Sequence, residues 1–149
     1  MASRTQPLTW EDIHQYDKCP PKVGLNRTIE IEEKYEKHKE SLSASNIKID
    51  EYINKKYFSG QNENKMFHFV CNNFPYNCTE NIKHYLIWVN PKYNKFFPDS
   101  LNYSKFDPLV KKEVSHTFDD KCEFIFFENI MELKSVKSIR HIHIFIKSN

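Results

Sequence analysis

Two histidines near the end of the chain have the type and spacing to do chemistry. The segment 141–147 reads HIHIFIK, in which His141 and His143 alternate with isoleucines. Imidazole titrates near neutral pH and can act as a nucleophile, an acid or base, or a ligand. In a strand, alternate side chains share a face, so the two imidazoles would lie about 6 to 7 Å apart on one face and the isoleucines on the other. We expect buried isoleucines and a histidine face directed at a ligand, a metal or a second part of the core.

Basic and hydroxyl side chains precede this strand and favour a phosphate-bearing ligand. They are Ser135, Lys137 and Arg140, although an exposed polar turn would look the same. A divalent metal is the competing interpretation, with His84 or His68 as a third ligand. Nothing fixes a fourth ligand, so we predict no metal site, and the sequence assigns no cofactor. In the third interpretation, the imidazoles only pack on the sheet and hydrogen-bond to neighbours.

Composition limits the classes of function. The 149 residues, 39% of them hydrophobic, are enough for one domain with a core, which we expect to span residues 1–149. Only 2 glycines are present, which excludes Gly-rich phosphate loops and dinucleotide fingerprints. The 22 basic and 20 acidic residues nearly cancel, so general DNA binding is not expected. No serine-hydrolase or thiol-protease signature is present.

The cysteines and the apolar pattern indicate a location. The four cysteines form no CxxC pair, and no apolar segment near residue 1 indicates export. We therefore expect reduced thiols and a cytoplasmic protein. No run of 18 apolar residues predicts a membrane span. The richness in Lys, Asn and Ile is typical of an AT-rich genome, such as that of a large DNA virus, in which case the location would be the host cytoplasm.

The first part of the chain, residues 1–60, reads as helical. Thr9 can cap a short helix that runs to about Tyr16, and Thr28 can cap a second helix with a charged, solvated face. A third helical pattern covers about residues 47–58. The polar stretch 59–65 then separates this part from a sheet-rich part, residues 66–149.

The second part alternates strands with one helix. Asp107 followed by Pro108 predicts a helix start, with Val110, Val114 and Phe118 as its buried stripe. The predicted strands cover residues 66–71, 82–89, 122–128 and about 139–147. The order indicates an α+β domain, with the helical N-terminal part packed on a mainly antiparallel sheet.

Several short blocks along the chain resemble the GlcNAc-induced-protein family of fungi and large viruses. The blocks occur in order from about residue 9 to residue 147. They are Trp10-Glu11-Asp12, Leu25-Asn26-Arg27, Tyr35, Asn73-Phe74-Pro75-Tyr76, His84, Trp88, Phe126-Phe127-Glu128-Asn129, Ser135-Val136 and His141-x-His143. That family is largely a domain of unknown function, so the resemblance implies no activity.

A more distant resemblance supplies candidate chemistry. An Asn-Phe-Pro block at Asn73, a strand beginning near His84, an intervening helix and a late His-x-His strand are similar to histidine-triad and galactose-1-phosphate-uridylyltransferase-like proteins. The resemblance implies a histidine-triad-like fold, with His143 as the nucleophile that attacks an α-phosphate and His141 as its partner. It also places Asn73 and His84 near the ligand.

One departure from that pattern weakens the case for turnover. Phe145 stands where the superfamily has a third His or a Gln, and a phenyl ring cannot donate a hydrogen bond to phosphate. Losing such a donor removes about 3 to 4 kcal/mol of transition-state stabilisation. We therefore predict binding of a nucleotide, a nucleotide sugar or an RNA end, with Phe145 covering the base or ribose and little or no catalysis. The alternative is a nucleotidyl hydrolase or transferase that uses His143.

An aromatic segment suggests a function of another class. Residues 93–106 hold five aromatic side chains interspersed with lysines, which could stack bases or bind a protein partner in a viral or stress-response complex. The competing interpretation is that Phe96 and Phe97 fold back over the core, which we favour because exposed aromatics are uncommon.

Overall fold

The chain folds around a four-stranded antiparallel sheet. The computed structural model describes residues 6–97 and 103–148. The sheet order is β1-β2-β4-β3, and every neighbouring pair is antiparallel. This arrangement confirms the α+β class predicted from the sequence. The elements are α1 (Trp10–His14), α2 (Ile29–Ala44), α3 (Ile49–Tyr57), β1 (Phe67–Cys71), β2 (Ile82–Val89), α4 (Tyr103–Thr117), β3 (Glu123–Phe127) and β4 (His141–Lys147), with 3₁₀ turns η1 (Gly60–Asn62), η2 (Pro91–Phe96) and η3 (Met131–Leu133).

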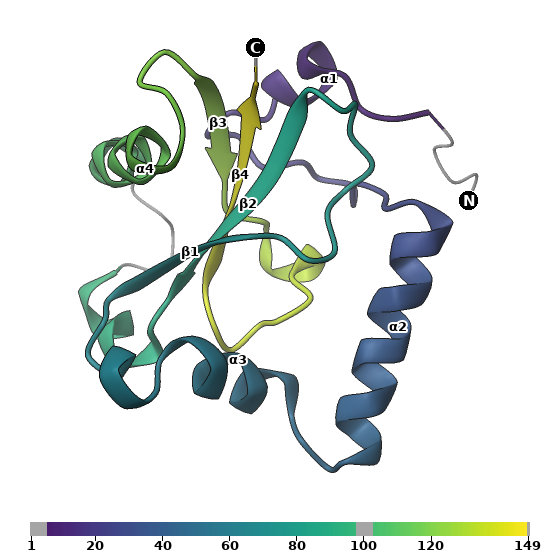
Figure 1. Cartoon of the computed structure of the whole chain (residues 1–149), viewed down its shortest axis with the longest axis vertical. Helices are drawn as coiled ribbons and strands as arrows, with labels where there is room; N and C mark the ends of the chain where they lie inside the picture. The colour runs from purple at the N-terminus through teal and green to yellow at the C-terminus, as the bar shows by residue number, and fades with distance from the viewer. Residues whose placement is uncertain (1–5, 98–102, 149) are drawn as a thin grey trace.

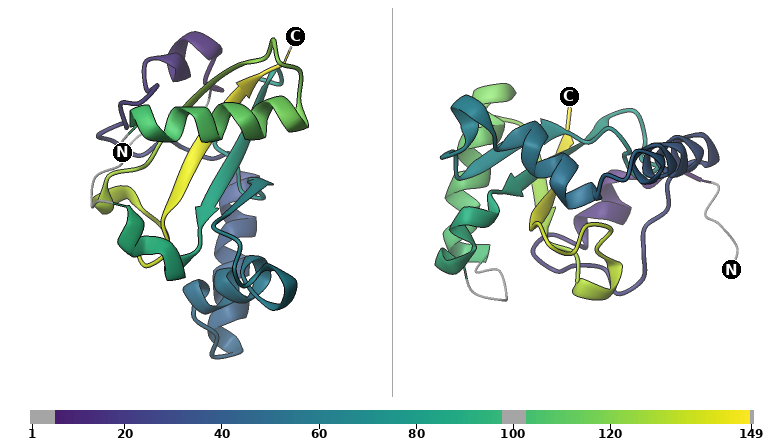
Figure 2. Two further views of the ribbon diagram at one scale, coloured as in Figure 1. Left: turned by 90° about the vertical axis from the view of Figure 1, so that its left-hand side faces the viewer. Right: turned by 90° about the horizontal axis from the view of Figure 1, so that it is seen from below.

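Strand β4 sorts its side chains as the alternation predicts. It lies inside the sheet between β2 and β3. Ile142, Ile144 and Ile146 are all 0% exposed and belong to a cluster with Val110 and Val114 of α4. Figure 2 shows α4 lying across this face of the sheet. We call this set the α4 cluster.

Helix α4 begins earlier than the sequence predicts. We expected Asp107 to cap the helix with Pro108 at its first position, but the helix already includes Tyr103 and holds Pro108 inside it. Phe106, only 3% exposed, packs in the α4 cluster, and this burial outweighs the backbone hydrogen bond that proline cannot donate. Asp107 instead forms an ion pair with Lys18 at 3.1 Å.

The other face of the sheet carries two separate apolar clusters. Near the start of β4, α3 packs Ile53 and Tyr57 against Trp88, which defines the α3 cluster. Near the end of β4, the N-terminal segment packs Leu8 and Ile13 around Phe145, which defines the N-terminal cluster. Figure 1 shows α3 at one end of the sheet and α1 at the other, with α2 alongside. His141 and His143 are on this face, ahead of Phe145 along β4.

The helix caps in the first part follow the sequence. Thr9 and Asp12 form a reciprocal capping box at α1, and Thr28 accepts a hydrogen bond from the Ile31 N–H at the start of α2. The charged side chains of α2 are exposed, whereas Tyr35 and Leu42 are buried. Helix α2 therefore turns Tyr35 toward Phe74 in the turn after β1, with ring centroids 5.0 Å apart.

The aromatic segment divides between core and surface. Phe97 packs on Phe67, and Phe106 is buried in α4, whereas Phe96 is 63% exposed. The expected fold-back therefore holds for Phe97 and not for Phe96, which ends the η2 turn. All four cysteines are free. Among the described residues, no helix is long and apolar enough to cross a bilayer.

Candidate functional site

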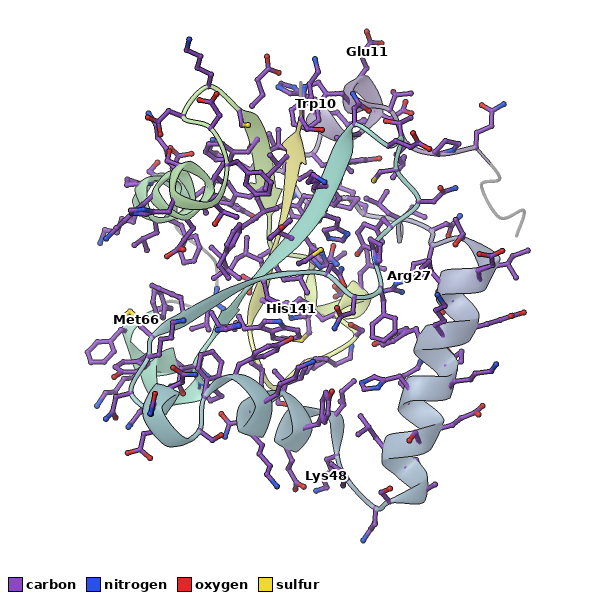
Figure 3. The ribbon with its side chains drawn as sticks, in the orientation of Figure 1. Trp10, Glu11, Arg27, Lys48, Met66 and His141 are labelled. Atoms are coloured by element: carbon purple, nitrogen blue, oxygen red, sulfur yellow. The ribbon has the colours of Figure 1, made fainter. Side chains whose placement is uncertain are left out.

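A cavity of about 180 Å³ opens on the histidine face of the sheet. Its walls come from the sheet, α2, α3, the turn after β1 and the segment before β4. Figure 3 shows Arg27 and His141 on the same side of the sheet, in the region toward α2 and α3. The wall combines aromatic rings with polar and charged groups. The aromatic members are Tyr35, Tyr52, Tyr57, Phe74 and Trp88, and the polar members include Arg27, His38, Lys56, Asn72, Asn73, Ser135, His141 and His143.

Two buried imidazoles, His141 and His143, lie at this wall, and a third, His84, lies behind His143. His84 Nδ1 accepts a hydrogen bond from the Tyr76 backbone N–H at 3.2 Å, so a neutral His84 carries its proton on Nε2. That nitrogen lies 2.9 Å from His143 Nδ1, which therefore accepts the hydrogen bond, so a neutral His143 carries its own proton on Nε2. The second nitrogen of His143 lies 3.1 Å from the Asn129 side-chain amide. Both nitrogens of His143 are thus engaged.

His141 is held differently. Its Nδ1 lies 3.2 Å from the Ile139 carbonyl, an acceptor, so Nδ1 donates and carries the proton of the neutral ring. Nε2 is then an acceptor, and no residue in the described part of the chain donates to it. The ring lies between Trp88 and His143, with centroid distances of 4.6 and 5.3 Å. His141 therefore presents one open lone pair at the cavity wall.

The environment keeps all three imidazoles neutral at pH 7. Burial lowers the pKa of His84 and His143 well below the ordinary 6.5, and the nearby Arg27 guanidinium and neighbouring imidazoles lower it further. Burial also lowers the pKa of His141 to about 4, although its hydrogen bond to the Ile139 carbonyl acts in the opposite direction. Neutral rings offer one donor and one acceptor each, which suits hydrogen bonding better than charge pairing.

Arg27 supplies positive charge at the cavity. Its Nε donates to the Phe74 carbonyl at 2.7 Å, and its guanidinium lies over the rings of Tyr35 and Tyr76 at 4.6 and 5.5 Å. Nη1 makes a long contact of 3.5 Å with the half-exposed Glu32. Nη2 has no hydrogen-bond partner among the described residues. The stacked rings fix the guanidinium plane while one edge stays open to a ligand.

A buried ion cluster lies next to the site. Arg140 contacts both carboxylate oxygens of Glu128, at 3.0 and 2.8 Å, and Lys134 contacts the same carboxylate at 3.1 Å. Burial acts to raise the pKa of Glu128, but the two cations hold it below its ordinary value. The cluster ties the strand end of β3 to the segment that precedes β4.

Comparison with known proteins places the chain in a family. Residues 9–147 match the model of a protein family of unknown function, "Protein of unknown function (DUF3605)". The chain belongs to this family. It is also 27% identical over 176 aligned residues to "N-acetylglucosamine-induced protein 1" of Candida albicans, covering 95% of this chain and 68% of that protein. These matches confirm the resemblance to the GlcNAc-induced-protein family.

The fold of this DUF3605 chain also occurs in a solved structure. "Crystal Structure of HTC1" superposes with a TM-score of 0.67 and 19% identity, covering 95% of this chain and 85% of that one. At that identity, the likeness concerns the fold alone.

The structure brings together four of the residues predicted from the sequence. His141, His143, Ser135 and Asn73 all line the cavity. Ser135 and Asn73 are exposed and therefore lie toward solvent, whereas the two imidazoles are only 3 to 4% exposed. The cavity wall thus includes a hydroxyl and an amide side chain beside the two imidazoles.

The other predicted residues lie away from the cavity wall. His84 is behind His143, and Phe145 stacks on His84 at 4.3 Å within the N-terminal cluster, where nothing in the cavity can reach its 0% exposed ring. The prediction that Phe145 covers a ligand base is therefore replaced by Trp88 and Tyr57 as the aromatic wall. Arg140 is paired with Glu128. The Lys137 ammonium donates to the Met131 carbonyl at 2.9 Å.

The metal interpretation does not find its ligands together. His68 on β1 stacks on Tyr57 at 4.4 Å, and His84 hydrogen-bonds directly to His143. Within residues 6–97 and 103–148, no three His, Cys, Asp or Glu side chains are grouped to hold an ion.

Sequence reasoning missed Arg27, Asn129 and the role of Trp88. No local spacing connects Arg27 with the histidines, because the turn after β1 and the start of α2 bring it to the sheet only in the folded chain. All three residues do stand inside the blocks that carry the family resemblance. That resemblance is the signal that could have found them.

Proposed function

We propose that this protein binds a phosphate-bearing small ligand, either a nucleotide, a nucleotide sugar or an RNA end, in the cavity on the histidine face. The observation that carries the proposal is the meeting of Arg27 with two neutral imidazoles, His141 and His143, at the wall of one cavity. The sheet face, the turn after β1 and the segment before β4 all contribute to it.

Arg27 is the phosphate-binding group in this proposal. A guanidinium binds two phosphate oxygens at once, and its hydrogen bonds to phosphate are stronger than neutral ones. Nη2 is open, and the competing Glu32 carboxylate is half exposed and 3.5 Å from Nη1. A phosphate that displaces this long contact would gain a partner already oriented by Tyr35 and Tyr76.

The aromatic wall accounts for the rest of the ligand. Tyr57 and Trp88 stack with a centroid distance of 6.1 Å, and Tyr52 and Phe74 flank His38 at 5.1 and 5.4 Å. Rings of this kind pack against the flat faces of bases and the apolar faces of sugars. These aromatic side chains therefore suit a base or a sugar in chemical character.

Binding without turnover agrees with the hydrogen bonds of His143. As a nucleophile, His143 needs a ring nitrogen with an open lone pair, but Nδ1 accepts from His84, and Nε2, which contacts Asn129, carries the proton of the neutral ring. Attack on a phosphorus would require breaking the hydrogen bond from His84 or moving that proton. In our proposal, His143 positions the wall, and the nucleotidyl hydrolase or transferase remains the alternative.

Thermal unfolding with a ligand panel tests the proposal. The panel is UDP-N-acetylglucosamine, UDP, ADP, a cap-like dinucleotide and inorganic phosphate. A ligand at 100 times its Kd stabilises the folded state by about 2.7 kcal/mol, which raises Tm by about 5 to 10 °C in a chain of this size. Arg27→Ala should remove the shift, whereas Lys111→Ala, on the exposed side of α4, should retain it.

Two outcomes would count against the proposal. If no compound of the panel raises Tm, or if Arg27→Ala shifts as far as the parent, the cavity is not a phosphate site. Mass spectrometry of the incubated ligands separates binding from turnover. Cleavage by the parent that is lost in His143→Ala would favour the enzyme alternative.

A further inference from the structure

A buried hydrogen-bond donor at the cavity wall has no partner. Trp88 is 6% exposed and lines the cavity, and its indole Nε1 has no hydrogen-bond partner in the part of the chain that the structure describes. Leaving a buried donor unpaired costs about 1 to 3 kcal/mol, so such groups nearly always have a partner in the working protein. Because Trp88 lines the cavity, a molecule in the cavity can supply the partner of this N–H.

An unpaired acceptor lies beside that donor. Trp88 and His141 are directly opposite each other in the β2 and β4 pairing, and their rings are 4.6 Å apart. Because the Nδ1 proton of His141 is directed at the Ile139 carbonyl, its Nε2 lone pair remains open. A donor and an acceptor therefore stand side by side on one wall of the cavity.

We propose that Trp88 Nε1 and His141 Nε2 recognise a planar amide-type group, in which a carbonyl oxygen and an N–H lie next to each other. This inference rests on the proposed function and names a second point of contact for the same ligand. The N3–H and carbonyl edge of a uracil base carries this pattern, because the ring holds both groups on one side. In the trans acetamido group of an amino sugar, the N–H and the carbonyl point in opposite directions, so that group can meet only one of the two protein atoms. The uracil carbonyl accepts from the indole, and the ligand N–H donates to the imidazole.

Other groups fit the pair less well. A carboxylate or a phosphate offers acceptors only and would leave the His141 lone pair facing another lone pair. An ammonium offers donors only and would face the indole N–H. The pKa of about 4 at His141 keeps Nε2 an acceptor throughout the neutral range. The arrangement therefore selects a neutral group that both donates and accepts.

The neighbouring side chains suit a flat group. Tyr57 stacks nearly parallel to Trp88, with an interplanar angle of 24°, and the Leu86 and Val136 side chains of the α3 cluster line the same cavity. Apolar walls exclude water, which strengthens the two hydrogen bonds. The loss of affinity when either bond is missing is therefore larger.

Calorimetric titration with matched ligand pairs tests the inference. The test pair is UMP and N3-methyl-UMP, in which the N–H is blocked, and the control pair is N-acetylglucosamine 1-phosphate and glucose 1-phosphate. We expect the parent to prefer UMP over N3-methyl-UMP by about tenfold or more and to discriminate less within the control pair. A larger preference within the control pair would overturn the inference. Trp88→Phe keeps the ring and removes the N–H, so it should reduce the preference for UMP to about twofold while N3-methyl-UMP binds as before.

The parent protein offers a second measurement that needs no change at Trp88. The chain has 2 tryptophans, so Trp10→Phe assigns the two indole N–H signals in an NMR spectrum. The Trp88 signal should move downfield with UMP and stay in place with N3-methyl-UMP.

The outcomes separate this inference from the proposed function. In one outcome, both members of each pair bind equally, the binding depends on Arg27, and the Trp88 signal does not respond. A water then satisfies the indole N–H, so the amide inference is wrong, whereas the phosphate proposal stands. If no phosphate compound binds, the proposed function fails. A preference that survives in Trp88→Phe would also overturn the inference.

Discussion

The two faces of strand β4 are equally buried but differently built. Ile142, Ile144 and Ile146 are 0% exposed and pack against α4, whereas His141 and His143 are 3 to 4% exposed and line a cavity. Fractional exposure alone would class both faces as core. The difference is that the isoleucines pack within one apolar cluster, while on the histidine face Trp88 Nε1 and His141 Nε2 have no hydrogen-bond partner among the described residues. Residual hydrogen-bonding capacity, more than exposure, distinguishes the face that carries the candidate site.

Truncating the isoleucine face should give the largest effect on stability. Ile144→Ala leaves a void beneath α4 and should lower the free energy of unfolding by about 2 to 5 kcal/mol. Urea unfolding measures this loss. Ligand affinity at temperatures where the variant is folded should stay within about twofold, because Ile144 lies on the other side of the sheet. A loss below about 1 kcal/mol would mean that this face is not close-packed.

Acid should destabilise the protein through the histidine face. The folded state keeps His141 neutral down to a pKa of about 4, whereas the unfolded chain protonates it near 6.5. The unfolded state therefore binds more protons between these values, and the free energy of unfolding falls as pH is lowered through this window. The contribution of His141 is on the order of 3 kcal/mol. It is fully present above pH 6.5.

Urea unfolding at pH 7, 6 and 5 measures this dependence. His84 and His143, whose pKa values are also lowered, act in the same direction. His141→Gln should give a shallower pH dependence than the parent. An identical slope in the two proteins would show that His141 is already charged or solvated in the folded state.

Replacing Arg27 should lower ligand affinity more than it lowers the stability of the fold. Arg27→Lys keeps the charge but loses the planar, two-pronged geometry, so we expect nucleotide affinity to fall about tenfold, equivalent to about 1.4 kcal/mol. Titration calorimetry measures this change. An unchanged Kd would mean that the phosphate is held elsewhere.

The smallest effect on stability is expected from the Tyr76 hydroxyl, which contacts Asn129 beside His143. The Asn129 side-chain amide donates to the Tyr76 hydroxyl at 3.1 Å and also contacts His143. Tyr76→Phe removes only the hydroxyl and should lower the free energy of unfolding by about 0.5 to 1.5 kcal/mol. Thermal unfolding at pH 7 can resolve this change, and a larger loss would indicate that Tyr76 orders the whole network.

Local pattern predicted the strand that carries the site but could not predict its surroundings. Period-2 alternation placed His141 and His143 together because side-chain direction in a strand depends on the backbone alone. The arrival of Arg27 and the pairing of Arg140 with Glu128 depend on contacts between distant segments, which no spacing encodes. The start of α4 was missed for the same reason, since burial of Phe106 overrides the local signal of Pro108.

The hydrogen bonds of His143 show a second limit of reasoning from a resemblance. The histidine-triad pattern assigned a nucleophile by position, but the reactivity of an imidazole depends on which nitrogen is open. In the folded chain, His141 retains an open nitrogen and His143 does not. The pattern therefore pointed to two rings that line one cavity, but the fold decides which nitrogen of each ring is open.

Nitrogen NMR of the imidazoles tests the central claim most directly, because it reports protonation, tautomer and ligand contact at once. At pH 7 we predict three neutral buried rings, with the His141 proton on Nδ1, and a shift of the His141 Nε2 signal when a saturating nucleotide or nucleotide sugar is added. A charged His141 ring at pH 7, or a His141 signal that ignores a ligand that binds, would contradict the account.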